Sequence, residues 1–402
     1  MQRVPLADGI YWVGAVDWGV REFHGYDTPH GSSYNSYLIV DEKVCVVDGV
    51  RAGLGPEMLR RVRGCCQEQT VDYLVVNHVE MDHSGCLPWL IEQLRPRKIL
   101  TSKRGQEALA LHFTREECEG WDVMAVGTGD EINLGSYTLS FIEAPMLHWP
   151  DSMFTYVKEP HILLPNDAFG QHLASSRRFA DELDMNVVME EAVTYFANIL
   201  MPFAGQVTKT IEKLIEMGLE IDTIAPSHGA IWRLREHVDA IIEAYAAWAR
   251  FEAKPRVCLV YDTMWHSTEK MAYAVADGVA QEDVEVTILP LSGTPLARVA
   301  RYVQESRAFL VGSPVLNNGM LPNVGRFLTY IKGLRPKSRL TGAFGSFGWG
   351  GGAVKEIDAT LRSMSLDVLE PLEVRYVPNE EELIACEEYG RQVARRVKEW
   401  VR

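Results

Sequence analysis

From Arg256 to the C-terminus, short apolar segments alternate with segments of helical spacing, and this alternation limits the possible folds more than any other feature of the chain. The apolar segments are VCLVYD, VEVTILPL, RAFLVGSP, RLTGAFGS and LDVLEPLEV. Apolar runs that alternate with helices are typical of parallel strands joined by crossover helices. The pattern therefore predicts a doubly wound parallel sheet of five strands.

The chain before this region mixes strands and helices less regularly. Strand-like segments such as SYNSYLIV, KVCVVDGV, TVDYLVVN and YTLSFIEA are separated by turns and helical patterns, which favours sheets covered by helices over a helical bundle. Residues 237–253 have the spacing of an amphipathic helix, and the following Lys254-Pro255 ends it. We therefore expect two α/β domains, residues 1–253 and residues 254–402.

The composition is that of a globular protein, with 402 residues of which 47% are hydrophobic and 24% are charged. No apolar run reaches the roughly 18 residues of a membrane span, and the N-terminal MQRVPLADGI lacks the apolar core of a signal peptide. The seven cysteines form no C-x-x-C, which argues against a disulfide framework, a zinc ribbon or a rubredoxin-type centre. A reducing cytoplasm is the expected compartment.

The net charge of −15 is unevenly distributed. From Pro255 onward there are 18 basic and 18 acidic residues, so the excess of 37 acidic over 22 basic residues lies before that point. Because an acidic surface repels phosphate backbones, nucleic acid is not an expected partner.

The stretch VVNHVEMDHSG places His78, Glu80, Asp82 and His83 directly after an apolar strand. Functional groups of α/β proteins collect in such loops between a strand and a helix. If the segment is extended, His78, Glu80 and Asp82 point to the same side. The stretch is also compatible with an acidic loop in which Asp82 caps the next helix.

Three further candidate ligands follow apolar strands elsewhere in the chain. These are His148 in MLHWPDSM, Asp167 in LLPNDAFG and His228 in IAPSHGAIW. Taken singly, either histidine is compatible with an ordinary buried or loop histidine. Taken with the first stretch, they complete four histidines and three carboxylates, which are the ligands for two metals that share one carboxylate. Such an oxygen-rich set suits iron or manganese better than zinc.

The spacing of these seven residues resembles that of the flavodiiron proteins, also called A-type flavoproteins, in their stand-alone two-domain form. Their N-terminal domain has the metallo-β-lactamase fold, an αββα sandwich whose usual H-x-H-x-D-H signature has Glu80 here in place of the second histidine. The resemblance implies that one iron is bound by His78, Glu80 and His148, and the other by Asp82, His83 and His228, with Asp167 bridging. In some members water replaces the histidine equivalent to His83. The resemblance also implies that His24 and Tyr195 lie over the open iron positions, where they would donate hydrogen bonds or protons.

The second domain carries three polar or glycine-rich loops at strand ends. TMWHSTEKMA opens a helix and resembles the flavodoxin phosphate loop, with His266 where flavodoxins usually have glycine. GSPVLNNGML and GSFGWGGG follow the third and fourth strands, and each alone is compatible with a simple turn. In a flavodoxin-like sheet of order 2-1-3-4-5 these loops meet at the switch point, which predicts an FMN site. The residues expected to contact FMN are Thr263, Met264, Trp265, His266, Ser267, Thr268, Pro314, Val315, Leu316, Asn317, Asn318, Gly319, Ser346, Phe347, Gly348, Trp349 and Gly350.

The resemblance implies an oxidoreductase in which FMN passes electrons to a di-iron centre that reduces nitric oxide to nitrous oxide, dioxygen to water, or both. It further implies scavenging of these gases in an anaerobe, an external donor such as rubredoxin or a reduced deazaflavin, and a head-to-tail homodimer or dimer of dimers. Two other functions remain open from the residues alone: a two-metal hydrolase fused to a flavodoxin module, and an electron carrier with a scaffold domain. Iron, zinc or no bound metal, respectively, would distinguish the three.

Overall fold

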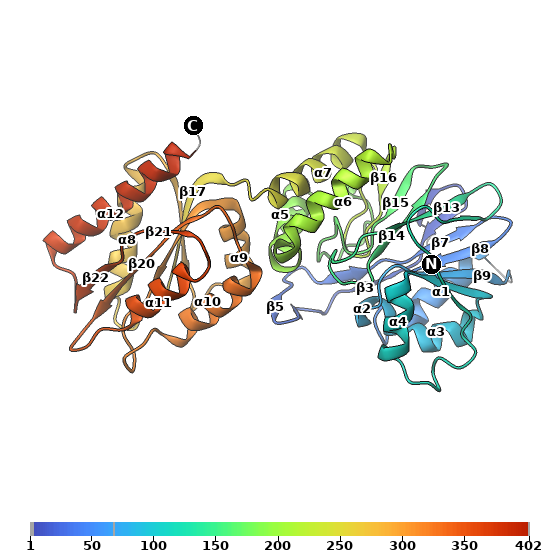
Figure 1. Ribbon diagram of the computed structural model, residues 1–402, viewed down its shortest axis with the longest axis horizontal. Coiled ribbons are helices and arrows are strands. Elements are labelled where there is room, and N and C mark those ends of the chain that lie inside the picture. The colour runs from blue at the N-terminus through green and yellow to red at the C-terminus, as the bar shows by residue number, and fades with distance from the viewer. Residues whose placement is uncertain (1–3, 67–68, 401–402) are drawn as a thin grey trace. The chain divides into compact units, whose positions relative to one another are not determined.

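The computed structural model describes residues 4–66 and 69–400, and the chain forms two compact units (Figure 1). One unit contains the chain up to Tyr195 together with Phe203–Ala246, and the other contains Phe196–Pro202 together with the chain from Ala247 onward. The domain division at residues 253 and 254 stays a prediction.

The first unit is built on two sheets. The first sheet has the order β1 (Val4–Ala7), β2 (Ile10–Trp12), β7 (Tyr37–Val40), β8 (Val44–Val47), β9 (Val71–Val76), β10 (Lys98–Thr101) and β11 (Val123–Ala125). The second has the order β12 (Glu131–Asn133), β13 (Thr138–Glu143), β14 (Met153–Val157), β15 (Ile162–Leu164) and β16 (Thr223–Ile224). Two hairpin-like pairs stand apart from them, β3 (Ala15–Asp17) with β6 (Ser32–Tyr34) and β4 (Glu22–Phe23) with β5 (Tyr26–Asp27).

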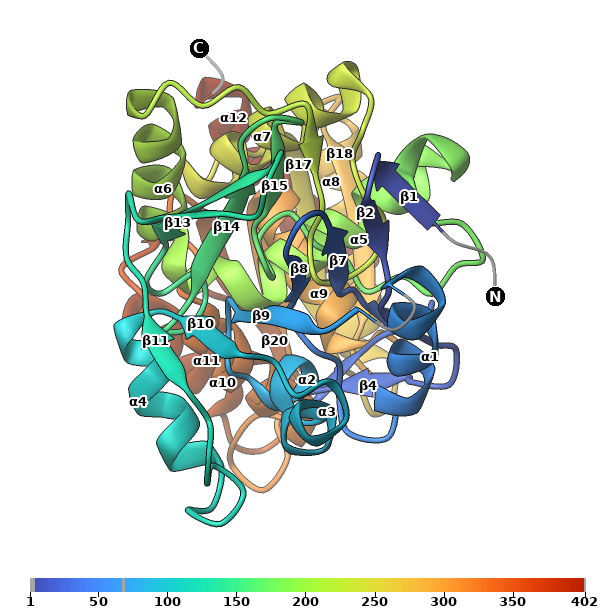
Figure 2. The same cartoon turned by 90° about the vertical axis from the view of Figure 1, so that its right-hand side faces the viewer.

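Alternate side chains of each central strand serve two different cores. On β8, Val46 belongs to the core under the helices, whereas Val47 belongs to the core between the two sheets. Helices α1 (Gly55–Cys66), α3 (Leu87–Leu94) and α4 (Lys103–His112) contribute to the first core, and α6 (Ala204–Glu216) and α7 (Arg235–Ala249) lie beyond the second sheet (Figure 2). Because successive strand residues face opposite sides, apolar residues at both alternating positions bury both faces. The unit is the predicted αββα sandwich.

The second unit is a parallel sheet with helices on both faces (Figure 1). Its strands are β17 (Lys254–Tyr261), β18 (Glu285–Pro290), β19 (Ser306–Gly312), β20 (Leu340–Phe347), β21 (Asp367–Val368) and β22 (Leu372–Arg375). Its helices are α8 (Ser267–Ala280), α9 (Leu296–Glu305), α10 (Pro322–Leu334), α11 (Ala353–Arg362) and α12 (Glu380–Glu399). The strand order β18-β17-β19-β20-β21 is the predicted 2-1-3-4-5 order.

One helical stretch, Met185–Glu216, is long and apolar enough to cross a membrane by composition alone. It contains α5 (Met185–Tyr195), the π-helical η2 (Phe196–Leu200), the 3₁₀ turn η3 (Met201–Phe203) and α6. Of its most apolar window, 61% is buried inside the protein, which is what a core helix of a globular protein also shows.

Candidate metal centre and flavin pocket

The loops that follow the strands of the first unit bring all seven predicted metal ligands together. His78 and Glu80 follow β9, and Asp82 and His83 lie on the short helix α2 (Met81–Ser84). The expectation that Asp82 lies in an extended segment is wrong, because the helix begins at Met81. The other ligands follow strands of the second sheet: His148 after β13, Asp167 after β15 and His228 after β16.

The first group of ligand atoms belongs to His78, Glu80, His148 and Asp167, and these atoms lie within 4.8 Å of one another. Nε2 of His148 lies 3.1 Å from Glu80 Oε2 and 3.3 Å from Asp167 Oδ2. Nε2 of His78 lies 3.3 Å from Glu80 Oε2. All four groups converge on one point.

The second group contains Asp82, His83 and His228, and it faces the other oxygen of Asp167. Nε2 of His228 lies 3.1 Å from Asp82 Oδ2 and 3.3 Å from Asp167 Oδ1. Nε2 of His83 lies 3.0 Å from the same Asp167 oxygen. Asp167 therefore offers one oxygen to each group, as a bridging carboxylate does.

The separations between donors fit a metal site. Ligand atoms about 2.1 Å from a metal lie about 3.0–3.4 Å apart around a six- or four-coordinate ion, which matches the distances above. Asp82 Oδ1 and Asp167 Oδ2 are buried without a hydrogen-bond partner in the part of the chain that the structure describes. A cation bound in the cluster would satisfy both oxygens.

The electrostatics of the cluster also require positive charge. Burial alone would raise the pKa of Glu80, but hydrogen bonds from His148, His24 and His78 outweigh it and lower that pKa. Burial opposes protonation of His228, yet its hydrogen bonds to Asp167 and Asp82 raise its pKa to about 10. Three carboxylates crowded in a buried site hold protons on their histidine neighbours unless metal ions supply the charge. The residues thus fit two divalent cations.

Two partners outside the cluster orient the ligand histidines. Asp151 Oδ2 accepts a hydrogen bond from His78 Nδ1 at 2.9 Å, and the Ser33 carbonyl oxygen accepts one from His228 Nδ1 at 2.8 Å. Both contacts leave Nε2 free to face the cluster, which is the usual arrangement around metal-bound histidines. Neither residue was predicted from the sequence. A signal for Asp151 was present, since it is a carboxylate three residues beyond His148.

His24 and Tyr195 both lie beside the metal ligands. His24 Nε2 is 2.7 Å from Glu80 Oε1, and its side chain is 59% exposed. The hydrogen bond to Glu80 raises the pKa of His24. The buried ring of Tyr195 lies 5.9 Å from the ring of His228, and burial raises the pKa of its hydroxyl.

A further histidine, His172, was missed by the sequence analysis. Its ring lies 5.1 Å from that of His228 and 5.0 Å from that of Tyr195. Nδ1 is 3.0 Å from Ser32 Oγ and Nε2 is 2.8 Å from Tyr26 Oη. Each ring nitrogen of His172 is therefore within hydrogen-bond distance of a hydroxyl group. Burial holds the pKa of His172 well below its usual value, so the ring is neutral.

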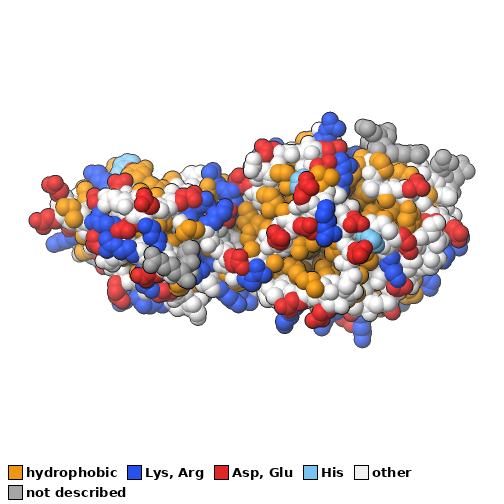
Figure 3. All heavy atoms as spheres, turned by 90° about the horizontal axis from the view of Figure 1, so that it is seen from above, with side chains coloured by type: hydrophobic (Ala, Val, Ile, Leu, Met, Phe, Trp, Pro, Cys, Tyr) orange, Lys and Arg blue, Asp and Glu red, His pale blue; other side chains and the backbone are white. Residues whose placement is uncertain are grey.

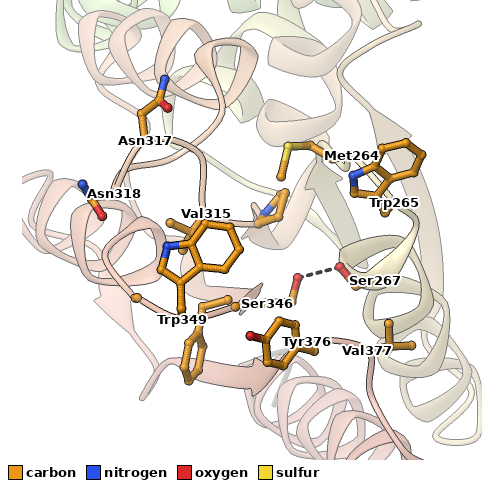
Figure 4. A pocket seen from close by; sticks show the side chains of 14 residues that line it. Met264, Trp265, Ser267, Val315, Asn317, Asn318, Ser346, Trp349, Tyr376 and Val377 are labelled. Carbon is orange, nitrogen blue, oxygen red and sulfur yellow. Dashed lines mark hydrogen bonds between the residues drawn. The ribbon is translucent and has the colours of Figure 1, made fainter.

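The second unit contains a pocket of about 560 Å³ at the carboxyl ends of its strands (Figure 4). This volume is in the range of small-molecule and cofactor sites. Twelve of the fourteen lining residues were predicted: Met264, Trp265, Ser267, Pro314, Val315, Asn317, Asn318, Ser346, Phe347, Gly348, Trp349 and Gly350. Tyr376 and Val377, which follow β22, also line it and were not predicted. The predicted residues Thr263, His266, Thr268, Leu316 and Gly319 lie in the same loops but do not line the pocket.

The phosphate loop has the features that an anion needs. His266 adopts a φ of 64°, the left-handed conformation that explains why flavodoxins usually have glycine there. The next residue begins α8, whose first N–H groups and dipole favour an anion. The buried Thr263 hydroxyl has no hydrogen-bond partner among the described residues. Ser267 and Ser346 hydroxyls are 2.6 Å apart and connect this loop to the end of β20 (Figure 4).

Aromatic side chains frame the open side of the pocket. Trp265 and Trp349 are 85% and 92% exposed, so both rings are available to a planar ligand. A Cβ at Gly348 would lie 3.2 Å from the ring of Tyr376, so glycine allows this ring to approach the loop. The pocket therefore combines an anion-binding end with aromatic faces, as an FMN site requires.

Comparisons with known proteins agree with both sites. The family described as ODP family beta lactamase matches residues 33–229, and the family described as Flavodoxin matches residues 259–390. The chain is 46% identical to a nitric oxide reductase of Moorella thermoacetica, over 98% of this chain and 99% of the relative. It is 38% identical to a rubredoxin-oxygen oxidoreductase of Megalodesulfovibrio gigas, over 99% of each chain. The crystal structure of a flavodiiron protein from Giardia intestinalis superposes with a TM-score of 0.95, at 37% identity and over 100% of this chain and 98% of that one.

The αββα sandwich with a two-cation cluster and the flavodoxin-like sheet with its pocket define a two-domain metalloflavoprotein. The chain belongs to the flavodiiron proteins. Its cofactors are FMN and a di-iron centre, as the sequence analysis predicted.

Proposed function

We propose that the chain reduces nitric oxide to nitrous oxide, dioxygen to water, or both, with electrons that pass from FMN to the di-iron centre. The observation that carries this proposal is that Asp167 joins two ligand groups in a chain that also has a flavin pocket. The relatives named for nitric oxide reduction and for oxygen reduction support this oxidoreductase function over the hydrolase alternative.

We assign one iron to His78, Glu80 and His148, the other to Asp82, His83 and His228, and the bridge to Asp167. When bound, the irons supply electrons and Lewis acidity, and FMN returns electrons to them. Reduction of two nitric oxide molecules consumes two protons, and reduction of dioxygen to water consumes four. His24 is suited to deliver them, because one side of its ring faces Glu80 and the side chain reaches solvent.

The flavin site is assigned to the three predicted loops together with Tyr376 and Val377. The anion end, near Thr263 and the start of α8, would hold the phosphate. The Trp349 ring would cover the isoalloxazine. These assignments rest on the lining residues and on the unpartnered Thr263 hydroxyl.

The external electron donor is assigned to rubredoxin, because the chain carries no C-x-x-C of its own and one relative is named for rubredoxin. A reduced deazaflavin is the other candidate donor. A head-to-tail homodimer, or a dimer of such dimers, would place the FMN of one subunit against the irons of the next. The seven scattered cysteines form no C-x-x-C, which fits a reducing cytoplasm as the compartment, where the enzyme would protect anaerobic metabolism.

The test is metal and flavin analysis of the purified protein followed by turnover with each donor. The proposal predicts two irons and one FMN per chain, and consumption of nitric oxide or dioxygen when reduced rubredoxin is added. Two zinc ions with ester or lactam hydrolysis would establish the hydrolase instead. Turnover with the deazaflavin alone would overturn the donor assignment and leave the gas reductase standing.

A further inference from the structure

The short hairpin β4–β5 carries His24 in its turn. The hairpin pairs Phe23 with Tyr26, so His24 and Gly25 form a two-residue turn between the strands. Both turn residues have positive φ values, 49° for His24 and 84° for Gly25, as a type I′ turn requires. The place of the His24 side chain therefore depends on where the hairpin lies.

The hairpin needs side-chain contacts to keep its position. It forms a two-stranded sheet of its own, and a two-stranded hairpin alone is at best marginally stable in water. The His24 side chain is 59% exposed, and its Nε2 lies 2.7 Å from Glu80 Oε1. A single hydrogen bond contributes little net free energy, so a further anchor is required to fix the turn.

His172 contacts both strands of the hairpin. Tyr26 on β5 is 4% exposed, and its hydroxyl oxygen lies 2.8 Å from His172 Nε2. Phe23 on β4 has its ring centroid 4.7 Å from that of His172. The hairpin is thus held at its Phe23–Tyr26 pair, which directly flanks the turn that carries His24.

His172 is itself fixed to the loop that carries His228. The residue before it, Gln171, is fully buried, and its side-chain oxygen accepts a hydrogen bond from the Ala230 N–H at 2.5 Å. The Gln171 N–H donates to the His228 carbonyl oxygen at 3.4 Å. A continuous set of contacts therefore leads from the His228 loop through His172 and Tyr26 to the hairpin turn.

We propose that Tyr26 and His172 are positioning residues that hold the hairpin so that His24 stays on Glu80 Oε1. Glu80 Oε2 faces the ligand histidines His78 and His148, so Oε1 is the oxygen left for His24. The inference rests on the proposed gas reductase, in which His24 delivers protons, and adds the contacts that keep His24 at the site.

Hydrogen exchange of the hairpin tests this role without turnover. Tyr26→Phe removes one hydroxyl and keeps the ring, so in the holoenzyme amide exchange of residues 22–27 is expected to rise several-fold. The loosened His24 is also expected to react several-fold faster with diethyl pyrocarbonate. Among the described residues, histidine side chains reach the surface at few places on the face drawn in Figure 3, which simplifies assignment of the modified histidine by peptide mapping.

The matched control for the exchange experiment is Tyr137→Phe. The Tyr137 hydroxyl donates a hydrogen bond to the Asp8 carbonyl oxygen at 2.7 Å, so this variant also loses one tyrosine hydroxyl contact, but outside the hairpin. Exchange of residues 22–27 is expected to stay at the wild-type rate in the control. Wild-type exchange and wild-type His24 modification in Tyr26→Phe would overturn the proposal.

A double-mutant cycle separates positioning from general packing. Tyr26→Phe and His172→Leu are each expected to lower the rate of flavin reoxidation by the gas several-fold, and to have no further effect in a His24→Gln background. His172→Gln keeps a hydrogen-bonding group and is expected to restore part of the rate. Equal losses in both backgrounds would overturn the proposal, because the effect would not pass through His24. Tyr26→Phe is nearly isosteric and keeps the cycle usable if His172→Leu does not fold.

Failure of this inference and failure of the proposed function are distinguishable. If the gases reoxidise the flavin but Tyr26→Phe changes neither exchange nor rate, the reductase function stands and the positioning role fails. If neither gas reoxidises the wild-type flavin, the proposed function fails, and exchange of residues 22–27 still decides whether Tyr26 and His172 hold the hairpin.

Discussion

Replacing Asp151 by asparagine tests how the protein prepares its first iron ligand. Asp151 is 3% exposed, and its Oδ2 accepts hydrogen bonds from His78 Nδ1 at 2.9 Å and from the Val79 N–H at 2.8 Å. These contacts direct His78 Nε2 toward Glu80. Burial would raise the pKa of Asp151, but the bond from His78 outweighs it and lowers that pKa, so the group is a carboxylate. Asparagine keeps the volume and removes the charge that makes His78 a stronger ligand.

The expected magnitude follows from the loss of that one partner. Removing an outer carboxylate from a metal-bound histidine costs about 10- to 100-fold in metal affinity. At about 1.4 kcal/mol per factor of ten, this is about 1.4–2.7 kcal/mol of iron-binding free energy. His148, Glu80 and Asp167 remain, so the variant is expected to bind iron but to release it to a weaker chelator.

The assay is iron retention in a titration with a competing chelator, read together with FMN content and the thermal midpoint. FMN binds in the other unit and is expected to stay at the wild-type level. Asp181→Asn is the matched control, since Asp181 pairs with Arg233 outside the ligand set. Iron retention by Asp151→Asn equal to that of the wild type, with the protein folded, would refute the reasoning.

Three further predictions address stability, pH and flavin binding. Arg339 is 1% exposed and donates hydrogen bonds to backbone carbonyl oxygens, including those of Val303 and Gln304. Arg339→Met should therefore lower the unfolding free energy of the second unit by about 3 kcal/mol. A denaturant titration that gives the wild-type unfolding free energy would contradict this. Burial holds the folded-state pKa of His172 below 6.5. Its contribution to stability is therefore complete above about pH 6.5 and falls by about 1.4 kcal/mol per pH unit below it. In urea titrations, His172→Gln should reduce the slope of unfolding free energy against pH, and an unchanged slope would contradict a neutral, buried His172. Thr263→Val should weaken FMN binding about tenfold, measured by quenching of flavin fluorescence. Thr360→Val is the control, since Thr360 lies on α11 and does not line the pocket. Equal affinities of Thr263→Val and the wild type would exclude Thr263 from the phosphate site.

Much of the fold follows from local pattern. Parallel strands bury both faces, so β17 and β19 contain the continuous apolar runs VCLVY and AFLV, and the loops at the ends of β17, β19 and β20 locate the flavin pocket. The expectation that the fifth segment, LDVLEPLEV, forms a single strand is wrong. It forms β21 and β22, both paired with β20, because Pro371 lacks the N–H that would continue the ladder.

The metal ligands were accessible from sequence because four of them lie within six residues and the others follow strands. Their partners were not. Asp151 and His78 are 73 residues apart, and His172 meets Tyr26 across 146 residues. Such pairs depend on how the two sheets pack, which no local spacing encodes.

The most direct test of the gas-reductase function is anaerobic stopped-flow of the fully reduced protein, mixed separately with nitric oxide and with dioxygen. The account predicts that at least one gas reoxidises the bound flavin much faster than it reoxidises free FMN, with nitrous oxide formed from nitric oxide or water from dioxygen. Fast turnover with one gas and slow or inactivating turnover with the other would name the physiological substrate. Reoxidation no faster than that of free FMN with both gases would contradict the account and return the two-metal hydrolase to first place.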